Sequence, residues 1–135
     1  MPSVLIVDDD RLVRETVRIL LSARGYEVVL AESGKAGIEI GRSHSFDVAI
    51  VDLFMPDVDG LQVIGAIHQS NPNLPIIAAS GFMFGNNQAC PEMPDFNSMA
   101  VEAGAVSTLY KPFRPDALLN EVARAVGNSA SKQSV

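Results

Sequence analysis

Four short apolar runs in the sequence end in residues that could take part in chemistry. These residues are Asp8, Asp9 and Asp10 after the first run, Asp52 after the second, Ser80 after the third and Lys111 after the fourth. Converging carboxylates repel one another unless a cation neutralises them, and oxygen ligands without His or Cys suit a hard ion such as Mg²⁺. A lysine and a hydroxyl group beside that ion would stabilise a phosphoryl group during in-line transfer. Because a carboxylate can form an acyl phosphate, Asp52 is the candidate nucleophile.

The segments around these residues predict strands that alternate with amphipathic helices. Strands are expected at 4–7, 26–31, 47–53, 75–80 and 106–110, where apolar residues form short runs. Helical spacing of apolar residues is found over 11–25, 33–44, 61–69, 94–105 and 114–126. The first helix is expected to turn one face inward, formed by Leu12, Val13, Thr16, Val17 and Leu20.

The order of these elements predicts an α/β fold. Five repeats of strand then helix indicate right-handed crossovers and one doubly wound parallel sheet, with helices on both faces. In such sheets ligands bind beyond the carboxyl ends of the strands, near the point where the strand order reverses. The candidate residues all follow strands, so we expect them to meet at this edge.

The composition of the chain indicates a single globular domain and argues against several classes of protein. The chain has 135 residues, of which 47% are hydrophobic, and this is enough for one domain with its own core. A net charge of −6 and a pI near 4.7 argue against a surface that binds nucleic acid or anionic lipid. A signal peptide and a membrane span are not expected, which predicts a cytoplasmic protein. The single cysteine, Cys90, excludes an internal disulfide.

Some polar residues have a structural interpretation instead. Asp10 and Asp59 each precede a predicted helix and are expected to cap it. His44 and His68 lie on polar helical edges without a second ligand at a suitable spacing, so both are expected to be solvated.

Taken in chain order, “VLIVDDD”, “VDLFMPDVDG”, “AAS” and “YKPF” resemble a response-regulator receiver domain, similar to the single-domain chemotaxis receiver. The resemblance assigns residues 1–127 to the receiver and leaves 128–135 as a flexible polar tail. It implies a flavodoxin-like (βα)5 fold with a five-stranded sheet, bound Mg²⁺, and phosphorylation by a histidine kinase or phosphotransfer protein. It also implies a monomer or weak dimer that signals by contact with a downstream protein, whose identity the sequence does not give.

The resemblance also implies roles for individual residues. They are Asp52 as phosphoacceptor, Asp9 as a direct Mg²⁺ ligand, Asp8 as a ligand through water, the Phe54 backbone carbonyl as a further ligand, and Ser80 and Lys111 as partners of the phosphoryl group. On this basis the chain is not an enzyme with an external substrate. It is a phosphoacceptor that catalyses its own phosphorylation and dephosphorylation.

Three features depart from the usual pattern of that family. Thr108 stands where a switch aromatic is common, which puts the usual coupling to the hydroxyl residue in doubt. Phe54 and Phe82 occupy the two positions that tune phosphoryl lifetime, and their rings predict slow hydrolysis because they cannot orient water. The segment 81–96 is longer than usual, and is either a partner surface or a flap over the sheet edge.

Other functions compete with this interpretation. One is an Mg²⁺-dependent aspartyl-phosphate hydrolase of the haloacid-dehalogenase-like class, in which an Asp-x-Asp nucleophile follows the first strand and a cap domain recognises substrate. Here the Met-Pro aspartate ends the third strand, and 135 residues leave no room for a cap. Another is a degenerate receiver that only binds partners. The chain could also be a receiver fragment of a larger regulator or hybrid kinase.

Overall fold

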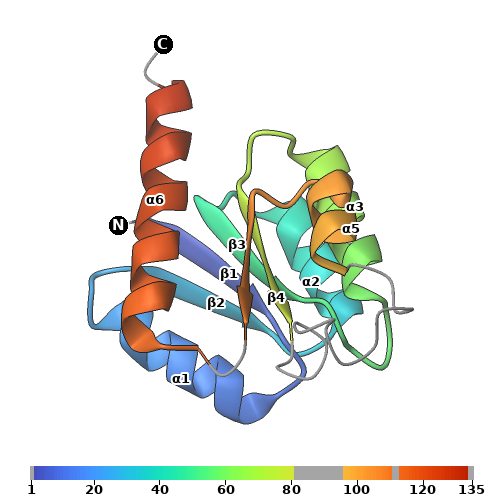
Figure 1. The fold of residues 1–135 in the computed structure, drawn as a ribbon, viewed down its shortest axis with the longest axis horizontal. Coiled ribbons are helices and arrows are strands. Elements are labelled where there is room, and N and C mark those ends of the chain that lie inside the picture. Colours follow the sequence, from blue (N-terminus) through green and yellow to red (C-terminus); the bar gives the residue numbers. More distant parts are fainter. Residues whose placement is uncertain (1, 81–95, 111–112, 134–135) are drawn as a thin grey trace.

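The computed structural model describes residues 2–80, 96–110 and 113–133, which form five strands and five helices (Figure 1). In chain order these are β1 (Ser3–Val7), α1 (Arg11–Ser22), β2 (Glu27–Ala31), α2 (Gly34–Ser43), β3 (Val48–Asp52), α3 (Gly60–Ser70), β4 (Ile76–Ser80), α5 (Phe96–Ala103), β5 (Ser107–Tyr110) and α6 (Pro115–Gln133). Every predicted strand and helix is present, and apart from the C-terminal end of α6 the ends are shifted by a few residues at most.

The strands form one parallel sheet in the order β2-β1-β3-β4-β5. The chain moves from β1 outward to β2 and then returns to place β3 on the other side of β1, so the order reverses between β1 and β3. Figure 1 shows α1 and α6 on one face of the sheet and α2, α3 and α5 on the other. This is the predicted flavodoxin-like doubly wound fold, and its switch point lies where β1 and β3 end.

The continuous apolar strands follow from burial on both faces. Successive side chains of a strand point to opposite sides, so alternate residues enter two separate cores. In β1, Val4 and Ile6 pack with α1 and α6, whereas Leu5 and Val7 pack with the three helices on the other face. All five residues of both β3 and β4 are buried.

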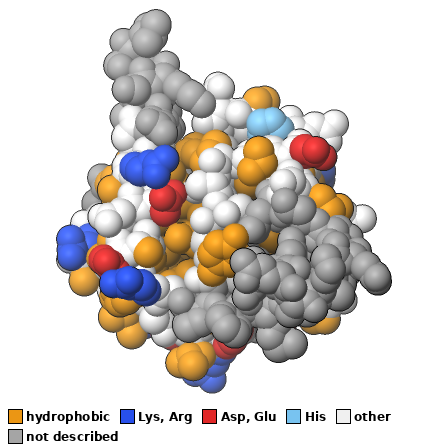
Figure 2. Space-filling view, in the orientation of Figure 1, with side chains coloured by type: hydrophobic (Ala, Val, Ile, Leu, Met, Phe, Trp, Pro, Cys, Tyr) orange, Lys and Arg blue, Asp and Glu red, His pale blue; other side chains and the backbone are white. Residues whose placement is uncertain are grey.

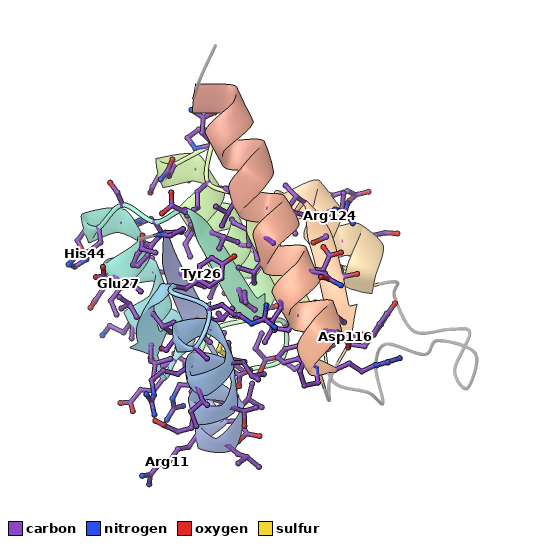
Figure 3. The ribbon with its side chains drawn as sticks, turned by 90° about the vertical axis from the view of Figure 1, so that its left-hand side faces the viewer. Arg11, Tyr26, Glu27, His44, Asp116 and Arg124 are labelled. Atoms are coloured by element: carbon purple, nitrogen blue, oxygen red, sulfur yellow. The ribbon has the colours of Figure 1, made fainter. Side chains whose placement is uncertain are left out.

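The inward face of α1 differs from the predicted one. Val17 and Leu21 are fully buried and Val13 and Leu20 partly so, whereas Leu12 is 74% exposed and Thr16 is exposed as well. Leu12 precedes Val13 by one residue, which turns its side chain about 100° away from the buried stripe. Figure 3 views the molecule from this side and shows Arg11 at the outer end of α1.

Glycines allow α2 to approach the sheet closely. Gly34, Gly37 and Gly41 are all buried on one face of this helix. A Cβ atom at Gly37 would lie 2.6 Å from Cγ1 of Val7 in β1, closer than real Cβ atoms come to their neighbours. The glycines weaken the sequence signal for this helix, and they are present because its backbone packs on a strand.

The last helix is longer than predicted. It begins at Pro115, where the missing N–H group costs no helical hydrogen bond, and buries Leu118, Val122 and Ala125. The helical backbone continues to Gln133, beyond the boundary predicted at residue 127. Residues after 127 lack a helix-breaking proline, so the chain can continue in this conformation. The flexibility predicted for 128–135 stays a prediction.

The prediction that His68 is solvated is confirmed only in part, because the residue is half-buried. His44 is exposed as expected, but the Nδ1 atom of His68 is buried and has no hydrogen-bond partner among the residues that the structure describes. Its ring lies against Gly104, where a Cβ atom would come within 2.6 Å of His68 Cγ. Gly104 has a φ of +133°, which favours glycine, and it ends α5 so that β5 can follow. The turn that ends α5 therefore covers part of His68.

Candidate functional site

Three predicted acidic residues meet where β1 and β3 end. Val7 pairs with Val51 in the sheet, so the next residue of each strand, Asp8 and Asp52, follows at the same level. Carboxylate oxygens of Asp8, Asp9 and Asp52 all lie within 4.8 Å of one another. Asp8 and Asp52 are buried, with 2% and 4% of their surface exposed, and Asp9 is exposed. The cluster thus has a buried side and a side open to solvent.

Hydrogen bonds fix the acidic turn after β1. The backbone N–H of Asp8 donates to the carbonyl of Ala31 at 3.1 Å, which extends the pairing with β2 by one residue. Asp8 Oδ1 accepts from the N–H of Asp10 at 2.9 Å, and Asp10 Oδ1 accepts from the N–H of Leu12 at 2.9 Å. Asp10 is therefore the N-cap of α1, as predicted, and the cap orients the Asp8 carboxylate.

The chain turns sharply after Asp52. Asp52 Oδ1 accepts from the N–H of Phe54 at 3.2 Å, and the Leu53 N–H donates to the carbonyl of Ala79 at 2.8 Å. The first residue of α3, Gly60, donates its N–H to the Leu53 carbonyl at 3.2 Å. The start of α3 therefore lies directly on the backbone of the residue that follows Asp52.

Gly60 is required for this close approach. It is buried, and a Cβ atom built on it would overlap the carbonyl oxygen of Asp52 and Cα of Leu53. Both are backbone atoms, so no side-chain rotation can relieve the contact. Asp59 caps α3 as predicted, since its Oδ1 accepts from the Leu61 N–H at 2.9 Å. The role of Gly60 is not among the predictions from the sequence.

The loop between β3 and α3 is also attached to α2. The two carboxylate oxygens of Asp57 accept from the backbone N–H groups of Gly34 and Lys35, each at 3.1 Å. The Lys35 and Gly34 N–H groups favour the charged carboxylate and lower the pKa of Asp57 below its usual value. Ser33 also caps α2 by accepting from the N–H of Ala36. The loop is therefore held by hydrogen bonds from Asp57 to α2 and from Asp59 to α3.

Ser80 ends β4 next to the acidic cluster. Asp52 pairs with Ala79, so Ser80 lies one residue further toward the same edge. The residue is 1% exposed, and its Oγ atom has no hydrogen-bond partner in the described part of the chain. A buried hydroxyl without a partner costs free energy, on the order of 1–3 kcal/mol, unless a bound group supplies one.

The donor set suits a hard cation together with an oxyanion. The clustered side chains provide oxygen atoms only, as Mg²⁺ and Ca²⁺ prefer, and a cation would relieve the repulsion among three carboxylates. The Ser80 hydroxyl, which has no partner among the described residues, can donate to an anionic oxygen bound beside Asp52. The site can therefore accommodate a metal ion and a phosphoryl group side by side.

The other predicted residues contribute no side chain to this cluster, or they lie outside the described residues. Phe54 is half-buried and packs against the core under α2 and α3. Thr108 is half-buried in β5 and lines a depression of about 430 Å³ together with residues of α5. Lys111, Phe82 and nearly all of the long segment 81–96 lie outside the described residues, so their roles stay predictions.

The family model and the curated relatives that match the chain all point to the same family. The family model for the response regulator receiver domain matches residues 4–123. The chain is 34% identical over 116 residues to the response regulator MprA of Mycolicibacterium vanbaalenii, covering 86% of this chain and 46% of that protein. It is 35% identical over 121 residues to the response regulator protein FleR of Pseudomonas aeruginosa, covering 90% of this chain and 24% of that protein. The chain thus spans less than half the length of these curated relatives.

Solved structures agree with the fold. A CheY-like response regulator receiver domain protein from Methanospirillum hungatei superposes with a TM-score of 0.87 at 23% identity, covering 98% of each chain. A chemotaxis protein of Vibrio cholerae gives a TM-score of 0.79 at 29% identity, covering 93% of this chain and 98% of that one. Among the described residues, every helix is too short or too polar to span a bilayer.

Proposed function

The chain belongs to the response regulator receiver domain family, and from this we propose that Asp52 accepts a phosphoryl group from a phosphorylated histidine of a kinase or phosphotransfer protein. The observation that supports the proposal most is that three carboxylates and a buried hydroxyl, which has no partner in the described part of the chain, lie at the ends of β1, β3 and β4. This combination supplies a nucleophile, a cation site and a donor to the phosphoryl group in one place.

The reaction that we propose is an in-line displacement at phosphorus. An oxygen of the Asp52 carboxylate forms a bond to phosphorus while the bond from phosphorus to the donor nitrogen breaks, and the donor leaves with its electron pair. Ser80 donates its hydroxyl hydrogen to a phosphoryl oxygen. Lys111, which lies outside the described residues, is proposed to place its ammonium group on another phosphoryl oxygen.

Asp8, Asp9 and Asp52 would hold Mg²⁺, with the Phe54 backbone carbonyl as a further proposed ligand. Bound Mg²⁺ would neutralise charge on the phosphoryl oxygens as the new bond forms. Asp9 is the exposed member of the cluster, and it can provide a ligand without a change in the buried residues.

Incubation with acetyl phosphate tests the proposal directly. We expect Mg²⁺-dependent labelling that stops at one phosphoryl group per chain, because a receiver is both the catalyst and the acceptor. Sustained release of phosphate from small phosphate esters would instead favour the hydrolase interpretation. An unlabelled protein that binds partners equally well before and after treatment would favour a degenerate receiver.

Mg²⁺ is expected to stabilise the folded protein. A ligand at about ten times its dissociation constant adds about 1.4 kcal/mol to the free energy of unfolding, which raises the melting temperature by several degrees. Asp9→Asn should remove this shift, whereas Asp116→Asn, which alters an exposed carboxylate on α6, should keep it. Thermal melts with and without Mg²⁺ measure this shift for each of the two variants and for the wild type. If millimolar Mg²⁺ left the melting temperature of the wild type unchanged, the acidic cluster would not be a metal site.

We further propose that the phosphoryl group is lost slowly. Hydrolysis needs a water molecule in line with phosphorus, and the ring of Phe54 offers water no hydrogen bond. Phe54→Asn combined with Phe82→Glu should speed the loss of label about tenfold, which corresponds to about 1.4 kcal/mol of activation barrier. The decay of labelled protein after removal of acetyl phosphate measures the rate. Equal decay of the double variant and the wild type would mean that other residues control access of water.

The output is proposed to be contact with another protein. Figure 2 views the side that carries β5, α5 and α6, and shows hydrophobic side chains at the surface among charged ones. Val101, Val106 and Tyr110 are exposed hydrophobic residues in or beside these elements. The acidic net charge argues against direct contact with nucleic acid by this chain.

A further inference from the structure

Arg14 contacts the backbone of the acidic turn. It lies at the end of the first turn of α1, and its Nη1 atom donates a hydrogen bond of 2.9 Å to the carbonyl oxygen of Asp8. Among the described residues its guanidinium group forms no ion pair with a carboxylate. The side chain is half-buried, so it is partly withdrawn from solvent. The hydrogen bond to Asp8 is thus its specific polar contact.

The contact completes a set of restraints on Asp8. The backbone N–H of Asp8 is bonded to Ala31, its side chain to the N–H of Asp10, and its carbonyl to Arg14. The peptide group that joins Asp8 to Asp9 includes this carbonyl. A movement of that peptide would shift both carboxylates relative to Asp52, since all three have oxygens within 4.8 Å of one another.

Arg18 provides a comparison on the same helix. It lies four residues after Arg14 and donates to the carboxylate of Glu15 at 2.7 Å, with 44% of its side chain exposed. Among the described residues, its hydrogen bonds go to Glu15 and none goes to Asp8. The two arginines therefore have equal charge and lie on the same helix, but only Arg14 reaches the acidic turn.

We propose that Arg14 is a positioning residue for the Mg²⁺ site, which it serves by fixing the peptide between Asp8 and Asp9. This inference rests on the cation site of the proposed function. Residues that orient metal ligands commonly affect metal affinity by 10–100-fold when they are replaced, although they do not touch the ion.

If Arg14 acted on the site through its charge alone, its replacement would strengthen Mg²⁺ binding and not weaken it. A guanidinium group near the site repels a cation, so neutralising Arg14 would strengthen Mg²⁺ binding if electrostatic repulsion were its main contribution. The loss of a restraint on Asp8 and Asp9 would weaken binding instead. The sign of the change in affinity therefore separates the two roles.

The experiment is a calorimetric titration of each folded variant with magnesium chloride at neutral pH. Arg14→Gln should raise the dissociation constant about tenfold. Arg14→Lys keeps the charge and one donor on a flexible stem, so it should cause a smaller rise. Arg18→Gln makes the same change of charge on the same helix and should leave the dissociation constant unchanged. Urea denaturation without Mg²⁺ and circular dichroism establish that each variant is folded.

Equal dissociation constants for Arg14→Gln and Arg18→Gln would overturn the inference, as would tighter binding by Arg14→Gln. A variant that loses stability but keeps its Mg²⁺ affinity would show that Arg14 only supports the fold. If Arg14→Gln does not fold, the inference is tested with Arg14→Lys instead. A dissociation constant for Mg²⁺ equal to that of the wild type would then contradict the inference. Absence of Mg²⁺ binding by the wild type would refute the proposed metal site itself, which is a different outcome.

Discussion

Asp52→Asn is expected to abolish labelling by acetyl phosphate while the protein stays folded. The amide has nearly the shape of the carboxylate and can still accept from the Phe54 N–H, but it lacks the nucleophilic charge. The substitution also removes one of three clustered charges, so the metal-free variant should be at least as stable as the wild type. Labelling measured by intact mass, together with urea denaturation, tests both effects.

Asp116→Asn is the matched control for this variant. It removes one carboxylate from the exposed start of α6, where Asp116 lies 3.5 Å from Arg114, and it should be labelled like the wild type (Figure 3). Undiminished labelling of Asp52→Asn would mean that another residue accepts the phosphoryl group. Loss of labelling in the control would show that the assay is sensitive to charge alone.

Gly60→Ala is expected to have the largest effect on stability. The added methyl group would overlap the backbone of Asp52 and Leu53, and a contact with backbone atoms cannot be relieved by a change of rotamer. Overpacking of this kind typically costs 1–3 kcal/mol, and we expect about 3 kcal/mol or more because the start of α3 must move. The same movement would displace Asp52, so labelling should fall as well.

Gly65→Ala is the control in the same helix. A Cβ atom at Gly65 would have no neighbour within 4 Å, so alanine should stabilise α3 by up to about 1 kcal/mol through its helix propensity. Urea denaturation of both variants gives the two changes in the free energy of unfolding. If Gly60→Ala were as stable as Gly65→Ala, α3 would not be in tight contact with the backbone after Asp52.

Much of this structure could be predicted because its signals are local in the sequence. Strands buried on both faces are continuous apolar runs, and Asp10 and Asp59 can be recognised as caps because a cap acts on its own helix. The polar residues at strand ends could be brought together by topology alone, because all strands of a parallel sheet end at one edge. This placed Asp8, Asp9, Asp52 and Ser80 correctly relative to the sheet.

Features that depend on packing between distant segments could not be predicted. His68 has a polar sequence context, and it is half-buried because Gly104, more than 30 residues later in the chain, packs against its ring. The contact of Arg14 with Asp8 depends on how α1 leaves β1, and Gly60 resembles any glycine after a capping residue. Helical spacing alone leaves the rotation of α1 undetermined by about one residue, so it predicts an inward Leu12 where the structure has an exposed one.

The most direct test of the central claim is to locate the phosphoryl group on the chain. Protein labelled with acetyl phosphate in the presence of Mg²⁺ is treated with borohydride, which reduces an acyl phosphate of aspartate to homoserine, and is then digested and sequenced by mass spectrometry. Our account predicts homoserine at position 52, and its absence when Mg²⁺ is removed with a chelator. Homoserine at Asp8 or Asp9, or labelling at position 52 that is independent of Mg²⁺, would contradict it.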